Sequence, residues 1–416
     1  MVMFSKLRSF ALQDERGRRG KLADLAIDLL ESDYPVITQL FIRNAAREQV
    51  RLPWEAIKTI EWRRHQITVS NLKVDPPAPE ELLAKEVLLR RDVIDALVLD
   101  LQNRRATRAN DLWLEEEGGR LLLKAADTSA RAVLRRLSRG RFAGQRTKSL
   151  YDWKYVEFLR GDPLAVRNGA GYRMRIKRLP PGEIAGLSSA LPYLHAAELL
   201  TLLPDAVAAD TLEIMPLRRQ LQIFGVLDEE QALRLLALMA PNTAADLLGR
   251  LGDVETRYYL ERLPKERAER IVELLRYPED TVGGIMTNEV VSVPTGLTVR
   301  EARLVLRDRL KVPDFVHLIY LVEDDETRTL RGAASLRDIV MADENKRMEE
   351  IMNPYLTILQ PLERASDGAY RVINSHLAAL PVVGKEGQLI GIVTVDAAVA
   401  QVAPQSWSSQ APKIFS

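Results

Sequence analysis

The side chains that most often carry out chemistry are sparse in this sequence. Its 416 residues include no cysteine, and its four histidines lie far apart: His65, His195, His317 and His376. Disulfides, thiolate metal sites and cysteine nucleophiles are therefore excluded, and a histidine-built zinc site would need ligands at closer spacing. We also find no nucleophile beside a base and no Walker-type phosphate loop. The sequence therefore predicts that the protein is not an enzyme.

Arginine gathers in three runs that could bind phosphate. The basic residues of these runs are Arg16, Arg18, Arg19 and Lys21, then Arg104, Arg105 and Arg108, then Arg131, Arg135, Arg136, Arg139 and Arg141. The last run is predicted to be helical, and a basic helix can bind nucleic acid, touch an acidic membrane surface or form a solvated face. No aromatic residues alternate with these charges, and the formal net charge of the chain is only +1. We therefore favour a solvated face and do not expect nucleic-acid binding.

The most regular part of the chain is a twelve-residue pattern written eight times between residues 179 and 274. Each unit opens with Leu or Met and closes with apolar residues three and four apart, which predicts one short helix per unit. Five units carry a proline where the first turn of a helix tolerates it: Pro180, Pro192, Pro204, Pro216 and Pro264.

Helices of about eight residues do not persist alone in water, so these helices must stack on their neighbours. We expect an all-α, right-handed solenoid over residues 176–275. Its core is predicted to include Leu191, Leu199, Leu203, Leu212 and Leu235. An irregular helical bundle is the alternative.

Length and hydropathy limit what the rest of the chain can be. A chain of this length is typical of about three domains. No run of about eighteen uninterrupted apolar residues occurs, and the first residues, MVMFSKLRSFALQDERG, meet charge too early for a signal peptide. We therefore expect no membrane-spanning segment, and the lack of cysteine fits a cytoplasmic location.

Residues 1–165 alternate short β-type runs with turn signals, which predicts small β-barrels. The stretches LPWEAIKTIEW and LYDWKYVEFLR place Trp54 and Trp153 before similar endings. We therefore expect two related barrels, at residues 1–80 and 81–165, with a turn-rich linker over residues 161–177. The runs GRRGKLADLAIDLLESDYPVITQLFI and LRRDVIDALVLDLQNRRATRANDLWL resemble PRC-barrel domains, and this resemblance implies adaptor modules for protein docking.

The last part of the chain repeats a β-α-β-β-α order, at residues 276–342 and 343–403, before a polar tail at 404–416. The phrases IMTNEVVSVP and IMNPYLTILQP, with RGAASLRDIV and IGIVTVDAAV, mark the two copies. These copies resemble a tandem pair of α/β CBS domains. Together with the helical units, they resemble the cytosolic part of MgtE-type magnesium channels. The resemblance implies a pair that dimerises and can bind ATP, ADP or AMP.

The CBS resemblance implies a nucleotide site built from a hydroxyl and a carboxylate at the end of the second strand, with a nearby cation for phosphate. In the first repeat Ser335, Asp338 and Arg337 supply all three groups. In the second repeat Thr394 is followed by Asp396, so the carboxylate stands one position earlier than in the family pattern. Asp338 could instead cap the helix that begins there.

The same resemblance implies acidic sites for Mg²⁺, since a hard cation needs several oxygen ligands. This sequence departs from that pattern, because Arg364, Ser366 and His376 stand where the family has acids. A weaker site for Mg²⁺ or Mn²⁺ could use the remaining candidates, Glu279, Asp280, Asp324 and Asp325. Acids in a hairpin loop are more often solvated turn residues, and we favour that interpretation of Asp324 and Asp325.

Taken together, these patterns predict a non-catalytic cytosolic regulator associated with divalent-cation transport. We expect it to dimerise through the CBS pair, to dock on a separate membrane transporter at the inner face of the membrane, and to respond to metal or adenine nucleotide. One alternative is an RNA-associated or assembly factor that uses the barrels. Another is a purely structural dimeric scaffold.

Overall fold

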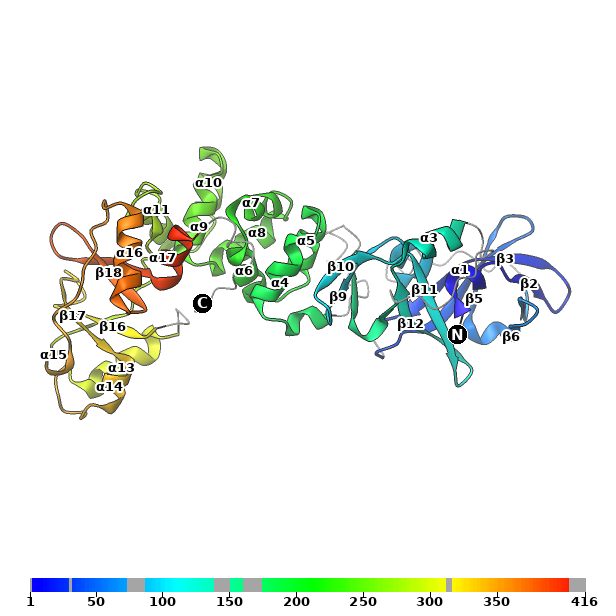
Figure 1. The fold of residues 1–416 in the computed structure, drawn as a ribbon, viewed down its shortest axis with the longest axis horizontal. Coiled ribbons are helices and arrows are strands. Elements are labelled where there is room, and N and C mark those ends of the chain that lie inside the picture. Colours follow the sequence, from blue (N-terminus) through cyan, green and yellow to red (C-terminus); the bar gives the residue numbers. More distant parts are fainter. Residues whose placement is uncertain are drawn as a thin grey trace. The chain divides into compact units, whose positions relative to one another are not determined.

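The computed structural model describes residues 2–29, 32–72, 87–137, 150–159, 174–311 and 316–403. The chain forms two compact units, residues 1–207 and 208–416, which are drawn together in Figure 1. The predicted polar tail, residues 161–173 of the predicted linker, and Arg139 and Arg141 of the third basic run lie outside the described residues. The side chains of Arg135 and Arg136 are also outside the description.

The first unit begins with a large, mostly antiparallel sheet. Among the described residues its eleven strands follow the order β1-β11-β12-β4-β3-β2-β7-β6, with β13 on β12, β5 on β4 and β8 on β3. The strands are β1 (Val2–Met3), β2 (Ala11–Asp14), β3 (Arg19–Asp28), β4 (Val36–Asn44), β5 (Gln49–Pro53), β6 (Ile57–Glu61), β7 (Gln66–Val69), β8 (Val87–Leu88), β11 (Asp111–Glu117), β12 (Arg120–Asp127) and β13 (Leu150–Asp152). Helices α1 (Phe4–Leu7) and α3 (Ala130–Leu137) contact β11.

A smaller sheet follows the order β10-β9-β14. Its strands are β9 (Leu97–Asp100), β10 (Arg105–Arg108) and β14 (Val156–Leu159). This sheet lies beside the first helices of the helical array: Arg104 forms an ion pair with Glu183 (2.5 Å). Irregular turns at Leu89–Val93 and Met174–Arg178 complete this part of the chain.

The two predicted barrels are not separate in the structure. Strands from residues 1–80 and 81–165 pair with one another, through Val2 with Leu114, Ala26 with Leu88 and Val36 with Leu122. One hydrophobic core also runs from Val2 to Phe158. An open strand edge exposes unpaired N–H and C=O groups, and here strands of each stretch satisfy the edges of the other. The β-rich character is therefore confirmed. In place of two separate barrels, the strands form one large curled sheet and a smaller three-stranded sheet, and one hydrophobic core includes residues of both stretches.

The tryptophan pattern produces the same local structure twice. β5 leads through a 3₁₀ turn at Trp54–Ala56 into β6, and β13 leads through a 3₁₀ turn at Trp153–Tyr155 into β14. Both tryptophans are buried, and the Trp54 ring nitrogen donates a hydrogen bond to the carbonyl of Gly119 (3.0 Å). The repeated strand–turn–strand unit supports an internal duplication.

The helical array contains one helix for each twelve-residue unit, as predicted. The helices are α4 (Pro181–Ser189), α5 (Tyr193–Thr201), α6 (Asp205–Ile214), α7 (Leu217–Phe224), α8 (Glu229–Leu238), α9 (Pro241–Leu248), α10 (Asp253–Leu260) and α11 (Lys265–Leu274). All five leucines predicted for the core are buried. Within the second unit α9 packs against α7 and α11.

The prolines stand one position earlier than expected. Pro180, Pro192, Pro216 and Pro264 are the N-cap residues of their helices, whereas Pro181 and Pro241 occupy the first turns of α4 and α9. An N-cap residue has extended backbone, with φ between −53° and −59° at these four prolines, which is the φ that the proline ring imposes. The prolines therefore end one helix and orient the next at no cost in hydrogen bonds.

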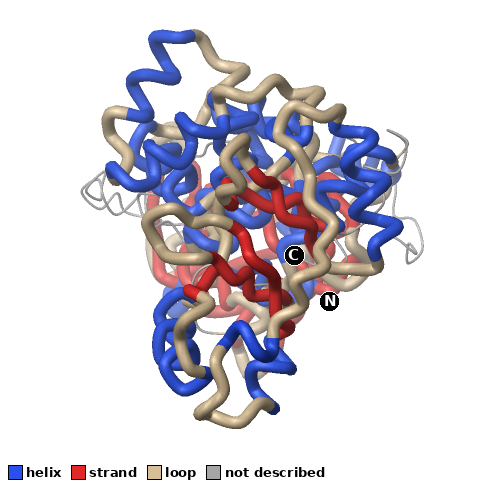
Figure 2. The backbone as a smooth tube through the Cα atoms, turned by 90° about the vertical axis from the view of Figure 1, so that its left-hand side faces the viewer, coloured by secondary structure: helices blue, strands red, loops and turns tan. Residues whose placement is uncertain are grey.

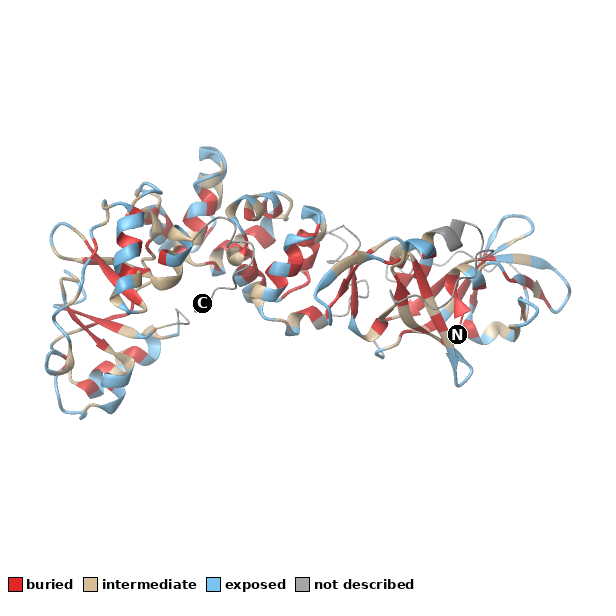
Figure 3. Cartoon of the chain, in the orientation of Figure 1, coloured by how far each residue is buried: buried red, intermediate tan, exposed pale blue. Residues whose placement is uncertain are grey.

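The second unit ends with one β-α-β-β-α repeat and a second repeat in the order α-β-β-α, in which the predicted first strand is reduced to a single parallel bridge between Leu359 and Val382. The first contains β15 (Ser292–Pro294), α13 (Val299–Arg309), β16 (Leu318–Val322), β17 (Leu330–Ser335) and α14 (Leu336–Met341). The second contains α16 (Ala365–Ser375), β18 (Ala379–Val383), β19 (Leu389–Thr394) and α17 (Val395–Val402). Figure 2 shows these strands flanked by helices, and Figure 3 shows them as buried segments.

The leading segment of each repeat crosses to the other repeat. α12 (Val282–Ile285) lies before the first repeat, yet Thr287 after it pairs with Ile392 of β19. α15 (Met348–Ile351) lies before the second repeat, yet Asn353 pairs with Ala333 of β17. The phrases IMTN and IMNP are therefore the two crossing points that join the repeats.

Candidate functional site

The three side chains predicted to bind nucleotide in the first repeat stand where β17 ends and α14 begins. Ser335 is the N-cap of α14, and its hydroxyl oxygen accepts a hydrogen bond from the Asp338 backbone N–H (3.0 Å). The same hydroxyl donates to the Asp338 carboxylate (2.6 Å). Arg337 and Asp338 are exposed, and Arg337 has no ion-pair partner among the described residues. We call Ser335, Arg337 and Asp338 the first-repeat triad.

The second repeat has the same cap without the same carboxylate. Thr394 ends β19 and caps α17, accepting a hydrogen bond from the Ala397 backbone N–H (3.3 Å). Ala397 therefore stands at the position that Asp338 occupies in the first repeat. Asp396 lies one residue earlier in the first turn of α17. The start of α17 therefore lacks the carboxylate that the start of α14 has, and this is the departure from the family pattern that the sequence predicted.

The strands of the two repeats meet near these helix starts. Ser335 pairs with Leu318 on β16, and Thr394 pairs with Ala379 on β18. The Tyr320 hydroxyl, two residues along β16, donates to the carbonyl of Ala379 (3.3 Å). Burial raises the pKa of Tyr320, so its phenol stays protonated as this donor. The hydrogen bond from Tyr320 therefore links the strand that pairs with Ser335 to the residue that pairs with Thr394.

His317 is a neighbour of this site that sequence reasoning treated only as an isolated histidine. Its carbonyl accepts a hydrogen bond from the Leu336 backbone N–H (3.1 Å), which places it beside Ser335. Its side chain is exposed. The strand order alone could have indicated this neighbour, because the residue before β16 must lie at the same sheet end as the residue after β17 in an antiparallel pair.

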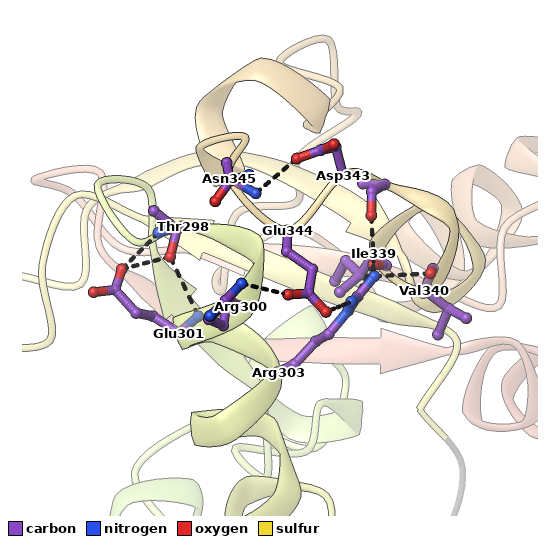
Figure 4. A network of polar contacts seen from close by, with 10 residues as sticks. Thr298, Arg300, Glu301, Arg303, Ile339, Val340, Asp343, Glu344 and Asn345 are labelled. Carbon is purple, nitrogen blue, oxygen red and sulfur yellow. Dashed lines mark hydrogen bonds and ion pairs between the residues drawn. The ribbon is translucent and has the colours of Figure 1, made fainter.

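A polar network anchors the other end of α14 (Figure 4). The Arg303 guanidinium donates to the carbonyls of Ile339 (2.9 Å), Val340 (2.8 Å) and Ala342 (3.1 Å). Glu344 forms ion pairs with Arg303 (3.5 Å) and Arg300 (2.8 Å). The last carbonyls of a helix have no partner within the helix, so one arginine of α13 satisfies the C-terminus of α14. This contact helps to orient the helix that carries the first-repeat triad.

Three of the four carboxylates proposed as weak metal ligands, those of Glu279, Asp324 and Asp325, have other partners. Asp325 forms a two-pronged ion pair with Arg309 (2.9 and 3.0 Å), and Asp324 accepts hydrogen bonds from the backbone of its own turn. Glu279 pairs with Arg250 (2.5 Å), and the Asp280 carbonyl accepts from the backbone of Ala365. In the part of the chain that the structure describes, no three His, Asp or Glu side chains come together as a metal site would require.

Among the described residues, no helix is both long and apolar enough to cross a bilayer.

Comparison with known proteins identifies the second half of the chain. The model of the MgtE intracellular N domain family matches residues 179–280, and the CBS domain model matches residues 282–345 and 348–402. The magnesium transporter MgtE of Thermus thermophilus is 34% identical over 226 residues, which are 53% of this chain and 49% of the transporter. The magnesium transporter MgtE of Bacillus subtilis is 24% identical over 244 residues, 58% of this chain and 54% of that protein. The chain spans about half the length of these curated relatives.

Solved structures support the same assignment. The cytosolic domain of the Mg²⁺ channel MgtE in complex with ATP is 31% identical, with a TM-score of 0.52, over 58% of this chain and 96% of that chain. The soluble part of a magnesium transporter is 28% identical, with a TM-score of 0.50, over 54% of this chain and 88% of that chain. From residue 179 to residue 402, this chain therefore belongs to the family of MgtE cytosolic domains, an MgtE intracellular N domain followed by a pair of CBS domains.

Proposed function

We propose that this protein is a non-catalytic regulator that binds adenine nucleotide at the first-repeat triad and acts with a membrane transporter of divalent cations. The observation that carries the proposal is the Ser335–Asp338 pair at the end of β17. It stands in a chain related to an MgtE cytosolic domain that was solved in complex with ATP. A hydroxyl and a carboxylate that lie within hydrogen-bond distance of each other can bind the two hydroxyls of a ribose.

The chemistry of binding follows from the groups present. Without ligand, the Ser335 hydroxyl donates to Asp338, so the carboxylate has one of its acceptor sites occupied. A ribose hydroxyl would replace that donor, and the charge of the carboxylate would strengthen the new bond. Arg337, exposed two residues after Ser335, supplies the cation for a phosphate group. The second repeat lacks a carboxylate at the matching position, so we expect one strong site per chain.

Nucleotide is a better candidate signal than free metal. Three acids near the junction and in the β16–β17 loop, Glu279, Asp325 and Glu323, are paired with Arg250, Arg309 and Arg331. An arginine already balances the charge that a divalent cation would have to balance, so each such carboxylate is a weaker metal ligand. We propose that Mg²⁺ or Mn²⁺ enters chiefly as a complex with the nucleotide phosphates.

We also propose that a second copy of this chain covers the outer helices of the CBS pair. Exposed apolar side chains occur on both repeats, with Leu304, Val340 and Met341 on α13 and α14 and with Tyr370 and Val399 on α16 and α17. Met341 is 79% exposed, which is costly for a side chain that stays in water. Light scattering should show a dimer, and a Met341→Glu variant should shift it toward the monomer. A monomeric wild-type protein would contradict this part of the proposal.

The ligand is best tested by calorimetric titration of ATP, ADP, AMP and adenosine, each with and without Mg²⁺. We expect heat with at least one phosphorylated nucleotide and a weaker signal with adenosine, because adenosine has no phosphate for Arg337. Titration of Mg²⁺ or Mn²⁺ alone should give little heat. Strong metal binding without nucleotide would instead favour a metal sensor.

The partner is tested separately by crosslinking in native membranes, followed by identification of the captured proteins. The proposal predicts a transporter of divalent cations among them. Recovery of ribosomal or RNA-bound proteins alone would favour the assembly-factor alternative.

A further inference from the structure

A group of exposed basic residues lies at one end of the large sheet, outside the CBS pair. β2 and β3 are joined by a turn at residues 15–18, and β4 and β5 by a turn at residues 45–48. Because Gly20 pairs with Asn44 and Lys21 with Arg43, these two turns lie side by side. Besides Arg18, which pairs with Asp14, the exposed basic residues here are Arg16 and Arg47 on the turns, and Arg19, Lys21 and Arg43 on the adjoining ends of β3 and β4. We call these five residues the basic turn cluster, and Figure 3 shows this part of the sheet as exposed.

The charges of this cluster are not balanced by neighbouring acids. None of the five side chains has a carboxylate partner among the described residues. Two nearby acids have other partners, since Asp14 pairs with Arg18 (2.7 Å) and Glu48 accepts from the Asn44 side chain (2.9 Å). Glu15 lies 4.0 Å from Lys58. The turns therefore present an excess of positive charge to solvent.

Two of these charges are placed where they repel one another. Lys21 and Arg43 are direct cross-strand partners on β3 and β4, and like charges at such positions destabilise a sheet. Arg19 lies two residues before Lys21 and therefore projects from the same face. Leu22 and Ile42, the neighbours in the strands, are buried on the opposite face. An anionic partner at the outer face would remove this repulsion.

Hydrogen bonds to side chains hold both turns beside the cluster in a fixed shape. The Asp14 carboxylate accepts hydrogen bonds from the backbone N–H groups of Arg16 (3.0 Å) and Arg18 (2.8 Å). In the neighbouring turn the Asn44 side chain accepts from the Glu48 backbone (2.9 Å), and Arg47 adopts a positive φ of 67°. Charges on ordered turns lose less conformational entropy when they meet a surface.

We propose that the basic turn cluster docks the protein directly on an anionic lipid surface. The charges lie on two neighbouring turns and on the strand ends beside them, which suits contact with a broad charged plane. No aromatic side chain lies among the five to stack on a base, as binding of single-stranded nucleic acid requires. This docking is independent of the nucleotide site and would place the protein at the membrane surface beside the transporter proposed above.

Co-sedimentation with vesicles tests this proposal on the whole chain. We expect binding to vesicles in which about a third of the lipid is phosphatidylglycerol, no binding to pure phosphatidylcholine, and loss of binding at high salt. The triple variant Arg19→Gln, Lys21→Gln, Arg43→Gln should weaken partitioning by roughly a hundredfold. A matched variant, Arg218→Gln, Arg307→Gln, Lys385→Gln, removes three exposed charges in the second unit and should bind like wild type.

Three results would overturn the proposal. They are no binding to anionic vesicles, equal loss in both triple variants, and tighter cluster-dependent binding to RNA than to vesicles. Because the cluster variant leaves Ser335 and Asp338 unchanged, its nucleotide titration should match wild type, which separates this result from the proposed function.

Discussion

Gly332 and Gly391 occupy equivalent positions in the two CBS repeats, and each lies against the segment that enters from the other repeat. A methyl group at Gly332 would stand 2.7 Å from the carbonyl oxygen of Asn353, and one at Gly391 would stand 2.9 Å from that of Thr287. Backbone atoms cannot move aside as a flexible side chain can, so the crossing strands would have to separate.

Alanine at either glycine should therefore lower the free energy of unfolding by about 1–3 kcal/mol. Urea unfolding measures this change. The control is Gly296→Ala, where an added methyl group meets nothing within 4 Å, and its effect should stay within about 0.5 kcal/mol. Equal effects at all three glycines would show that the close approach between the repeats does not matter for stability.

Asp246, on α9, makes the stability of the protein depend on pH. Loss of hydration and the Glu279 carboxylate raise its pKa to about 6, against 3.8 for an ordinary Asp, while Arg250 opposes the shift. The folded protein thus binds this proton more tightly than the unfolded chain does. The resulting stability is present below about pH 4 and is lost as pH rises through about 6.

Asp246→Asn should therefore stabilise the protein at about pH 8 and make no difference near pH 4. We expect a gain of about 1 kcal/mol, well below the full value of the pKa shift, because part of the Asp246 side chain stays open to solvent, which screens its repulsion by Glu279. Thermal unfolding of both proteins across this pH range gives the comparison. A constant difference at every pH would contradict the raised pKa.

Among the elements, α14 depends most on a single side chain. Arg303 satisfies three carbonyls at its C-terminus, so Arg303→Ala should cost about 1–3 kcal/mol by leaving them without protein partners. Arg300→Ala removes only the exposed ion pair to Glu344 and should cost less than about 1 kcal/mol. Chemical denaturation distinguishes the two variants. Nucleotide affinity should fall only for the Arg303 variant, because α14 carries the first-repeat triad; equal losses would reject this role.

The elements also show what sequence alone can reveal. The helical array was predictable helix by helix, because each twelve-residue unit is a local pattern of apolar residues and proline. The repeated order of strands and helices and the helix start at Ser335 were predictable for the same reason, although the first strand of the second repeat is only a single bridge. The joining of residues 1–80 and 81–165 into one sheet was not, because pairings such as Val2 with Leu114 depend on contacts between distant residues. The network of Arg303 and the neighbour His317 likewise follow from pairing and not from spacing.

At the scale of the second unit, a largely buried ion pair joins the helical array to the CBS pair. Arg267 of α11 pairs with Glu289 (3.1 Å), and their side chains are only 13% and 12% exposed. Arg270 adds a longer contact to the same carboxylate (3.7 Å), and burial lowers the pKa of Arg267. Asn288 donates to the Arg270 carbonyl (2.9 Å) and to Glu273 (3.0 Å). Arginine side chains of α11 therefore hold the helical array against the start of the CBS pair.

Glu289→Gln should cost about 3 kcal/mol, because it leaves the charge of Arg267 buried without its partner. The exposed pair of Arg250 and Glu279 at the same junction provides the control, and Glu279→Gln should cost less than about 1 kcal/mol. Limited proteolysis should detect loosening of α11 in the first variant only.

Arginine, and not a shared cation, closes this contact. Chelation of metal should therefore leave proteolysis of the wild-type protein unchanged, and faster cleavage on chelation would contradict this.

The central claim is that the first-repeat triad binds nucleotide, and calorimetric titration of ATP against three double-alanine variants tests it most directly. The variants are Ser335→Ala with Asp338→Ala, Thr394→Ala with Asp396→Ala, and Thr298→Ala with Glu301→Ala. The last pair removes a capping box from α13, at the sheet end opposite Ser335, and so controls for loss of a helix cap. The account predicts one nucleotide per wild-type chain, abolished only in the Ser335 and Asp338 variant. Absence of heat with folded wild-type protein, or binding retained in that variant, would contradict it.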